Sequence, residues 1–197
     1  RELAILRYAM QQYDHVSFER LLSGSGLELI HRALAYRAGL IHKEQLSAPE
    51  ITRRGLAGSD ALCAEVIEVF CLILGSAASN LAVTLGAMGG IYIGGGIVPR
   101  LGEHFDRSGF RARFEDKGRF ADYARAIPTF VITAEHATFV GASAIPGGFY
   151  ARGNGRGELM NGTASGWYLA ELMADGAGTL PPISRLRAFG ARALRRG

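Results

Sequence analysis

The pattern of apolar positions predicts two main helices in the first half of the chain. The first follows a Ser-Gly-Ser-Gly break at residues 23–26 and ends near Arg37, where Gly39 can stop it. The second opens at residues 59–60 and runs to about Leu85. The apolar positions, three or four residues apart, are Leu27, Ile30, Ala33 and Leu34 in the first helix, and Leu62, Val66, Val69, Phe70, Ile73, Ala77, Leu81 and Leu85 in the second. Toward its end the second helix is apolar or small on both faces, which predicts burial in a larger body.

Shorter elements are predicted on either side of the long helix. A short helical turn precedes the glycine–serine break, and a brief helix with Pro49 in its first turn comes before the long one. Residues 91–93 and 127–133 are predicted strands, because β-branched and aromatic residues cluster there. The charged stretch between the strands predicts surface helices interrupted by glycine, and residues 136–145 predict a closing helix. This alternation is typical of an α/β fold built around a mostly buried sheet.

The composition is that of a chain able to bury a sizeable core. Of the 197 residues, 48% are hydrophobic and 20% are charged, the balance of a soluble globular protein. We therefore expect one domain, or one large piece of a two-domain protein. The longest uncharged stretch is interrupted by glycines and polar residues, so we expect no membrane span. The first ten residues carry charge and lack a small-residue cleavage site, so we expect no signal peptide.

The cysteines indicate a reduced, cytoplasmic protein. Cys63 and Cys71 fall in the predicted long helix, about 12 Å apart along its axis, which is too far for a disulfide. We expect both to be buried apolar side chains. None of the five histidines has a partner at metal-ligand spacing, so we expect no metal site made by this chain.

The net charge of +4 belongs to the end of the chain. Residues 1–145 contain 15 Lys/Arg and 15 Asp/Glu, whereas residues 146–197 contain seven arginines, no lysine and three acids. Because the body is neutral, we do not expect nucleic-acid binding. Glycine is frequent and apolar periodicity fades after residue 145, so we expect residues 146–197 to be a disordered or fused tail. The abrupt change at Pro146 also fits an out-of-frame reading of a GC-rich gene.

The sequence GGIYIGGGIVPR at residues 89–100 places three glycines directly after a predicted strand. The Val-Pro pair that follows suits the start of a helix, so Gly94, Gly95 and Gly96 form the turn from the strand's carboxyl end into that helix. In α/β sheets ligands bind at this edge, and a bare backbone lets a nucleotide lie close. The alternative is a tight turn with nothing bound. The spacing matches neither the dinucleotide fingerprint nor the P-loop.

This stretch, together with HVSFERLLSGSGLELIHRAL, SGFRARFEDKGRF and IPTFVIT, resembles the C-terminal half of bacterial ATP-dependent glucokinases. The four segments lie in consistent order over about residues 1–145. The resemblance implies an incomplete lobe of the actin-like, ribonuclease-H-like sugar-kinase fold. It also implies a cytoplasmic enzyme with glucose and ATP as substrates and Mg²⁺ as cofactor, whose reaction brings glucose into glycolysis. A homodimer is one assembly that the resemblance allows.

The resemblance also assigns binding roles. Glu19 would lie in the sugar pocket, where a carboxylate can accept hydrogen bonds from two neighbouring sugar hydroxyls. The three glycines would let the backbone pass under the adenosine of ATP, and Ser23 and Gly24 would lie beside the nucleotide or sugar cleft. From the residues alone, Glu19 also fits an ordinary solvated helix glutamate. The RARFEDKGRF run fits a charged, solvated helix–turn–helix better than a phosphate site.

The chain departs from the family in what it lacks. The family carries its catalytic aspartate in an Asn-Asp pair, which accepts the proton of the sugar hydroxyl, and this sequence has no such pair. A phosphate loop is also missing, so we expect the base in an N-terminal lobe and an inactive chain on its own. A sugar-sensing regulatory protein with a kinase-like domain and a non-functional truncated product are the alternatives.

Overall fold

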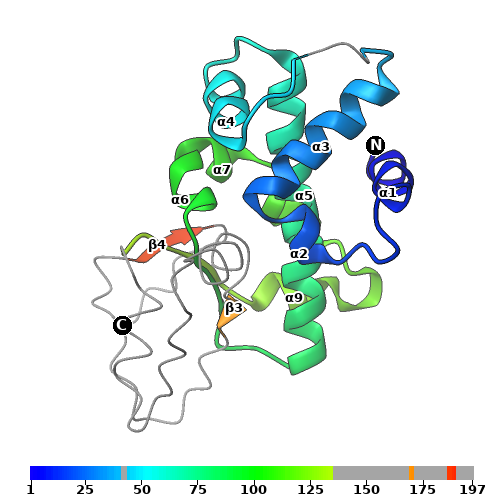
Figure 1. The fold of residues 1–197 in the computed structure, drawn as a ribbon. Coiled ribbons are helices and arrows are strands. Elements are labelled where there is room, and N and C mark those ends of the chain that lie inside the picture. Colours follow the sequence, from blue (N-terminus) through cyan, green and yellow to red (C-terminus); the bar gives the residue numbers. More distant parts are fainter. Residues whose placement is uncertain (41–43, 135–168, 171–185, 190–197) are drawn as a thin grey trace, which may run out of the picture.

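The described part of the molecule is mainly helical (Figure 1). The computed structural model describes residues 1–40, 44–134, 169–170 and 186–189. The helices are α1 (Glu2–Met10), α2 (Phe18–Leu21), α3 (Gly24–Arg37), α4 (Ala48–Leu56), α5 (Ala61–Leu85), α6 (Ile97–Leu101), α7 (Glu103–Arg107), α8 (Phe110–Glu115), the 3-10 turn η1 (Gly118–Phe120) and α9 (Ala121–Ala126). The strands are β1 (Ile91–Ile93), β2 (Thr129–Ile132), β3 (Leu169–Ala170) and β4 (Leu186–Phe189). The α/β alternation that the sequence predicts is thus confined to one part of a largely helical body.

The long helix α5 runs through the middle of this body, as Figure 1 shows. Asp60 begins it by accepting hydrogen bonds from the backbone amides of Leu62 (2.9 Å) and Cys63 (3.3 Å), and Gly86 ends it in the left-handed conformation (φ 69°). It packs against α3, α4 and α8. By length and composition α5 could cross a membrane, but 61% of its apolar window is buried inside the protein. That is the environment of a core helix.

The contact between α5 and α8 brings two backbones close together. A Cβ on Gly75 of α5 would lie 2.5 Å from the carbonyl oxygen of Phe110, so only glycine fits there without a shift. Arg111 of α8 then donates hydrogen bonds to the carbonyl oxygens of Ile127 (2.9 Å) and Arg125 (3.0 Å), directly before β2. The first arginine of the RARFEDKGRF run therefore holds the strand to the helices.

The sequence patterns did not predict α1. Ile5 and Ala9 of α1 are buried, and Glu2 accepts two hydrogen bonds from the Arg113 guanidinium, at 3.0 and 2.7 Å. The opposite side of the helix is apolar as well. Its exposed side chains include Leu3, Leu6 and Met10. Because both faces carry apolar residues, the helix shows no clear amphipathic pattern.

The predicted break before α3 is shorter than expected. Helix α3 begins at Gly24, inside the Ser-Gly-Ser-Gly stretch, so only residues 22–23 separate it from α2. The reason is a cap, because the Ser23 hydroxyl accepts a hydrogen bond from the backbone amide of Gly26 at 3.1 Å. The predicted end is confirmed, since the helix stops at Arg37 and Gly39 has a φ of 72°.

Both predicted strands are confirmed, and they lie side by side. Strands β1 and β2 are parallel, with Ile91 opposite Thr129. The short strands β3 and β4 add antiparallel neighbours, which gives the order β3-β1-β2-β4. β3 and β4 fall within residues 146–197, where the sequence predicts a disordered or fused tail. The rest of that segment and the predicted closing helix lie outside the described residues.

The cysteines behave as the sequence predicts. Cys63 and Cys71 are both buried and are not joined by a disulfide. Burial raises the pKa of the Cys71 thiol to about 12. Because the thiolate is the reactive form, this cysteine is chemically inert.

We expect Gly26→Ala to destabilise the fold. A Cβ at this position would lie 2.2 Å from the carbonyl oxygen of Leu21 in α2. Forcing an atom into a filled site costs about 1–3 kcal/mol of unfolding free energy, which urea unfolding of this chain will measure. Gly24→Ala is the matched control, because its Cβ would make only an ordinary 3.8 Å contact with the Cβ of Ala48. Equal stabilities of the two variants would contradict the tight α2–α3 contact.

Candidate functional site

Glu19 lies on α2, a four-residue helix that forms a corner with α3. The Ser17 hydroxyl begins α2 by accepting a hydrogen bond from the backbone amide of Arg20 at 3.3 Å. The buried Ser23 begins α3 in the same way through the amide of Gly26. Glu19 itself is exposed. The corner therefore presents the Glu19 carboxylate to solvent from a short helix that Ser17 caps and that the capped start of α3 follows directly.

The structure brings Ser23 and Gly24 into the same corner as Glu19. The Ser23 hydroxyl is occupied within the protein, because it caps α3 and lies 3.0 Å from the hydroxyl of Ser25. This capping role was missed in the sequence, although a serine directly before a helical pattern is the usual signal for it. The predicted position of Ser23 and Gly24 beside a ligand cleft stays a prediction.

A cation–π contact joins the same corner to the segment after α1. The guanidinium carbon of Arg20 lies 3.8 Å from the ring centroid of Tyr13. The Tyr13 side chain is half-buried and packs against the hydrophobic core. No sequence signal identifies such a pair, since the two residues lie in different elements.

The three glycines form the turn between β1 and α6, as the sequence predicts. Gly95 has a φ of 98°, a conformation that side chains rarely adopt, so the turn itself requires glycine there. Gly96 is different. Its φ of −88° and ψ of −12° suit any residue, and a Cβ would meet no described atom within 4 Å. The described structure thus explains the glycine at position 95 but not the one at position 96.

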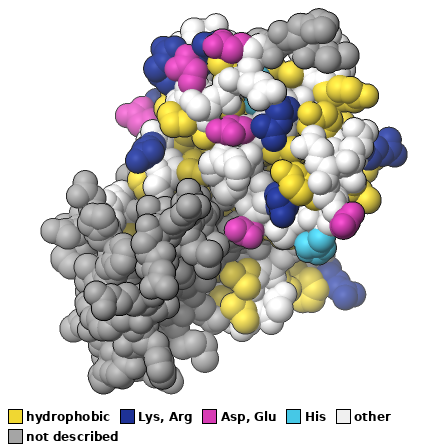
Figure 2. Space-filling view, viewed as in Figure 1, with side chains coloured by type: hydrophobic (Ala, Val, Ile, Leu, Met, Phe, Trp, Pro, Cys, Tyr) yellow, Lys and Arg dark blue, Asp and Glu magenta, His cyan; other side chains and the backbone are white. Residues whose placement is uncertain are grey.

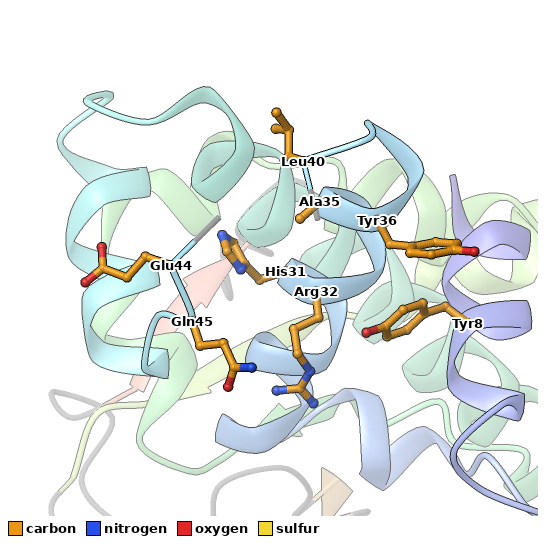
Figure 3. A pocket seen from close by; sticks show the side chains of 8 residues that line it. All are labelled: Tyr8, His31, Arg32, Ala35, Tyr36, Leu40, Glu44 and Gln45. Carbon is orange, nitrogen blue, oxygen red and sulfur yellow. The ribbon is translucent and has the colours of Figure 1, made fainter. Parts of the chain in front are cut away.

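The predicted residues occupy two places in the fold. Glu19, Ser23 and Gly24 lie at the α2–α3 corner, and Gly94 to Gly96 lie at the carboxyl end of β1. A pocket opens at a third place, between α1, α3 and the residues that precede α4 (Figure 3). Its lining consists of Tyr8, His31, Arg32, Ala35, Tyr36, Leu40, Glu44 and Gln45. None of the residues that the sequence assigns to a ligand lines this pocket.

Several charged side chains on the described surface are paired locally. Hydrogen bonds from Arg53 and Arg54 lower the pKa of the Glu50 carboxyl to about 2, and Arg37 pairs with Glu65 at 2.9 Å. On the face seen in Figure 2, basic and acidic side chains are interspersed with apolar ones. Within the described residues, this face therefore lacks the continuous basic stripe that nucleic-acid binding proteins present.

The described residues offer no ready-made metal site. No group of three His, Cys, Asp or Glu side chains among residues 1–40, 44–134, 169–170 and 186–189 is placed to hold an ion.

Comparison with known proteins places these features in a family. A family model described as Glucokinase matches residues 1–147. The glucokinase of Chromobacterium violaceum is 55% identical over 144 residues, which cover 73% of this chain and 41% of that protein. A bifunctional protein glk of Burkholderia pseudomallei is 57% identical over 145 residues, which cover 74% of this chain and 22% of that protein.

A solved structure agrees with the sequence comparisons. The crystal structure of a glucokinase from an Antarctic psychrotroph superposes with a TM-score of 0.67 at 34% sequence identity, and the match covers 72% of this chain and 44% of that chain. The chain thus has a sugar-kinase fold and spans less than half the length of these relatives. With residues 1–147 matched by the family model, the chain belongs to the glucokinase family.

Proposed function

We propose that this chain is the C-terminal part of an ATP-dependent glucokinase, in an actin-like, ribonuclease-H-like lobe. The complete enzyme transfers the γ-phosphoryl group of ATP to the 6-hydroxyl of glucose. The observation that carries the proposal is the family match over residues 1–147. The exposed Glu19 at the α2–α3 corner and the glycine turn after β1 support it.

In this proposal Glu19 binds the sugar. An ionised carboxylate only accepts hydrogen bonds, and its two oxygens can accept them from two neighbouring hydroxyls. Such charge-assisted hydrogen bonds are shorter and stronger than neutral ones. The exposure of Glu19 supports this role, because the carboxylate can meet a ligand without breaking an internal contact.

The glycine turn binds the nucleotide. A ligand lying against the backbone would explain why position 96 is glycine, where the fold alone accepts a side chain. The turn follows the carboxyl end of β1, which is the edge of a parallel sheet where ligands bind. We assign the adenosine of ATP to this place, and we keep Ser23 and Gly24 beside the nucleotide or sugar cleft.

The general base and the phosphate loop belong to the part of the enzyme that precedes this chain. Mg²⁺ is held in kinases by nucleotide phosphates and one or two carboxylates. We therefore assign the binding of sugar and adenosine to this chain, and we assign the proton transfer to the missing part. Cytoplasmic location and a homodimer stay predictions.

We also propose that residues 146–197 are not part of the kinase. The family model ends at residue 147, and the match to the Chromobacterium protein covers 144 residues. The short pairings of β3 and β4 with the sheet are then additions to the kinase lobe.

We expect this chain alone to show no glucose phosphorylation, because loss of a general base typically removes about 10²–10⁴-fold of rate and the phosphate loop is missing too. A chimera should restore activity. It joins the part of the Chromobacterium violaceum glucokinase that precedes the matched segment to residues 1–147 of this chain. A coupled assay should then give turnover in the usual kinase range of about 1–100 s⁻¹.

Two results would contradict this prediction. Turnover by the isolated, folded chain would show that the base lies within it. A folded chimera without activity would show that residues 1–147 no longer support the family's chemistry. A second chimera that ends at residue 197 should match the first in turnover, and a clear advantage of the longer one would give the tail a role.

In the chimera, Glu19→Gln should lower kcat/KM for glucose by about 10- to 200-fold, because a hydrogen bond to a charged group contributes roughly 1.5–3 kcal/mol. The KM for ATP should hardly change, since the adenosine is assigned to another part of the fold. Glu103→Gln is the control, because Glu103 is an exposed glutamate on a different helix, α7. An unchanged kcat/KM for glucose in Glu19→Gln would indicate that Glu19 is an ordinary solvated surface residue.

Gly96→Ala tests the nucleotide assignment. The fold accepts a side chain at this position, so the melting temperature should be unchanged. The KM for ATP should rise by about fivefold or more as the methyl group crowds the adenosine, whereas the KM for glucose should stay the same. Gly95→Ala should instead lower stability, because its φ of 98° is strained for alanine. A Gly96→Ala enzyme with normal ATP kinetics would indicate that the glycine turn binds no nucleotide.

A further inference from the structure

The helix that carries Glu19 is too short to hold its own shape. Isolated helices shorter than about 12–15 residues are marginal in water, and α2 has four residues. Ser17 caps the start of α2, Ser23 caps the start of α3 directly after it, and Gly26 allows α2 to lie close against α3. Neither contact restrains the exposed side of α2, where Glu19 and Arg20 lie.

Tyr13 supplies a contact on that exposed side. Its ring centroid lies 3.8 Å from the guanidinium carbon of Arg20, the residue next to Glu19. The ring is anchored in turn. The backbone amide of Tyr13 donates to the carbonyl oxygen of Ala9 at 3.0 Å, and its side chain packs on the core. The exposed surface of α2 is thus tied through Arg20 to the end of α1.

Helix α1 is itself fixed to the body of the protein. Ile5 and Ala9 are buried, and the Glu2 carboxylate is bound by Arg113 of α8 through two hydrogen bonds. A continuous chain of contacts therefore runs from α8 through α1 and Tyr13 to the residue beside Glu19. Such a chain can restrain the position of a side chain that projects into solvent.

The contact with Tyr13 also limits how the Arg20 guanidinium can interact with the neighbouring Glu19 carboxylate. A flexible arginine next to a binding carboxylate can hydrogen-bond to it and compete with a sugar hydroxyl. Adjacent residues on a helix do not face each other, and the stacked guanidinium is held on the Tyr13 ring. The ring thus holds the Arg20 guanidinium in one place and leaves the Glu19 oxygens open.

We propose that Tyr13 is a positioning residue for the sugar site, which acts through Arg20 to hold α2 and leave the Glu19 carboxylate available to glucose. This inference rests on the proposed role of Glu19. It adds a specificity element that lies outside the two predicted binding stretches, on the segment between α1 and α2.

The test uses the active chimera and three variants. Tyr13→Leu keeps an apolar side chain but removes the π face, and Arg20→Met keeps the length but removes the charge. Each should raise the KM for glucose by about 2- to 5-fold, the change that an exposed cation–π contact supports. The kcat and the KM for ATP should stay the same. Tyr13→Phe keeps the ring and should behave like the parent enzyme.

Two combinations separate this proposal from the one on which it rests. The double variant Tyr13→Leu/Arg20→Met should raise the KM for glucose no more than the larger single effect, because both substitutions remove the same contact. Adding Tyr13→Leu to Glu19→Gln should cause little further change, since the residue being positioned is already impaired. If Glu19→Gln alone has no effect on glucose, the proposed sugar site fails, and the positioning role fails with it.

Other outcomes overturn the positioning role alone. With Glu19→Gln impaired as expected, a normal KM for glucose in Tyr13→Leu would remove Tyr13 from the site. So would a general loss, in which Tyr13→Leu lowers the melting temperature and impairs glucose and ATP kinetics equally, because that pattern belongs to a purely structural residue. A Tyr13→Phe enzyme as impaired as Tyr13→Leu would show that the hydroxyl, and not the ring, is what matters.

Discussion

The burial of α5 depends on glycines that let neighbouring backbones approach it. A Cβ on Gly75 would collide with the Phe110 carbonyl oxygen at 2.5 Å, and one on Gly55 of α4 would lie 2.8 Å from the carbonyl oxygen of Cys63. A Cβ on Gly109, directly before α8, would lie 2.6 Å from the Leu72 side chain. Close-packed interiors tolerate such additions poorly. Without these contacts α4 and α8 would move outward, and the helices that present the site would lose their support.

The geometry of the candidate sugar site depends on this packing. Helix α3 lies against α5, and α2 lies against α3 with Gly26 at their contact. Arg113 of α8 binds Glu2 and thereby fixes α1, which holds Tyr13 beside Arg20. An exposed carboxylate can thus be presented by a rigid scaffold, although the helix that carries it has only four residues. Binding sites generally need support of this kind, because a ligand gains little from a group that must first be ordered.

The sequence predicted those elements whose apolar residues recur at regular spacing or whose ends carry clear start and stop residues. Helices α3, α4 and α5 and strands β1 and β2 follow from periodicity, from the cap at Asp60 and from Pro49. Helix α1 was missed because Leu3, Leu6 and Met10 cover its outer side as well. The start of α3 was misplaced because glycine and serine suggested a break where Ser23 in fact caps the helix.

The site was less accessible to sequence reasoning. Glu19 came from family resemblance, since an exposed helix glutamate carries no signal of its own. The difference between Gly95 and Gly96 needed backbone angles, and the Tyr13–Arg20 contact needed the fold. The most direct measurement is a crystal structure of the chimera with glucose and a non-hydrolysable ATP analogue. We predict the Glu19 carboxylate within about 2.5–3.0 Å of two glucose hydroxyls and the adenosine against the backbone of residues 94–96. Glucose bound elsewhere, with Glu19 in solvent, would contradict the account.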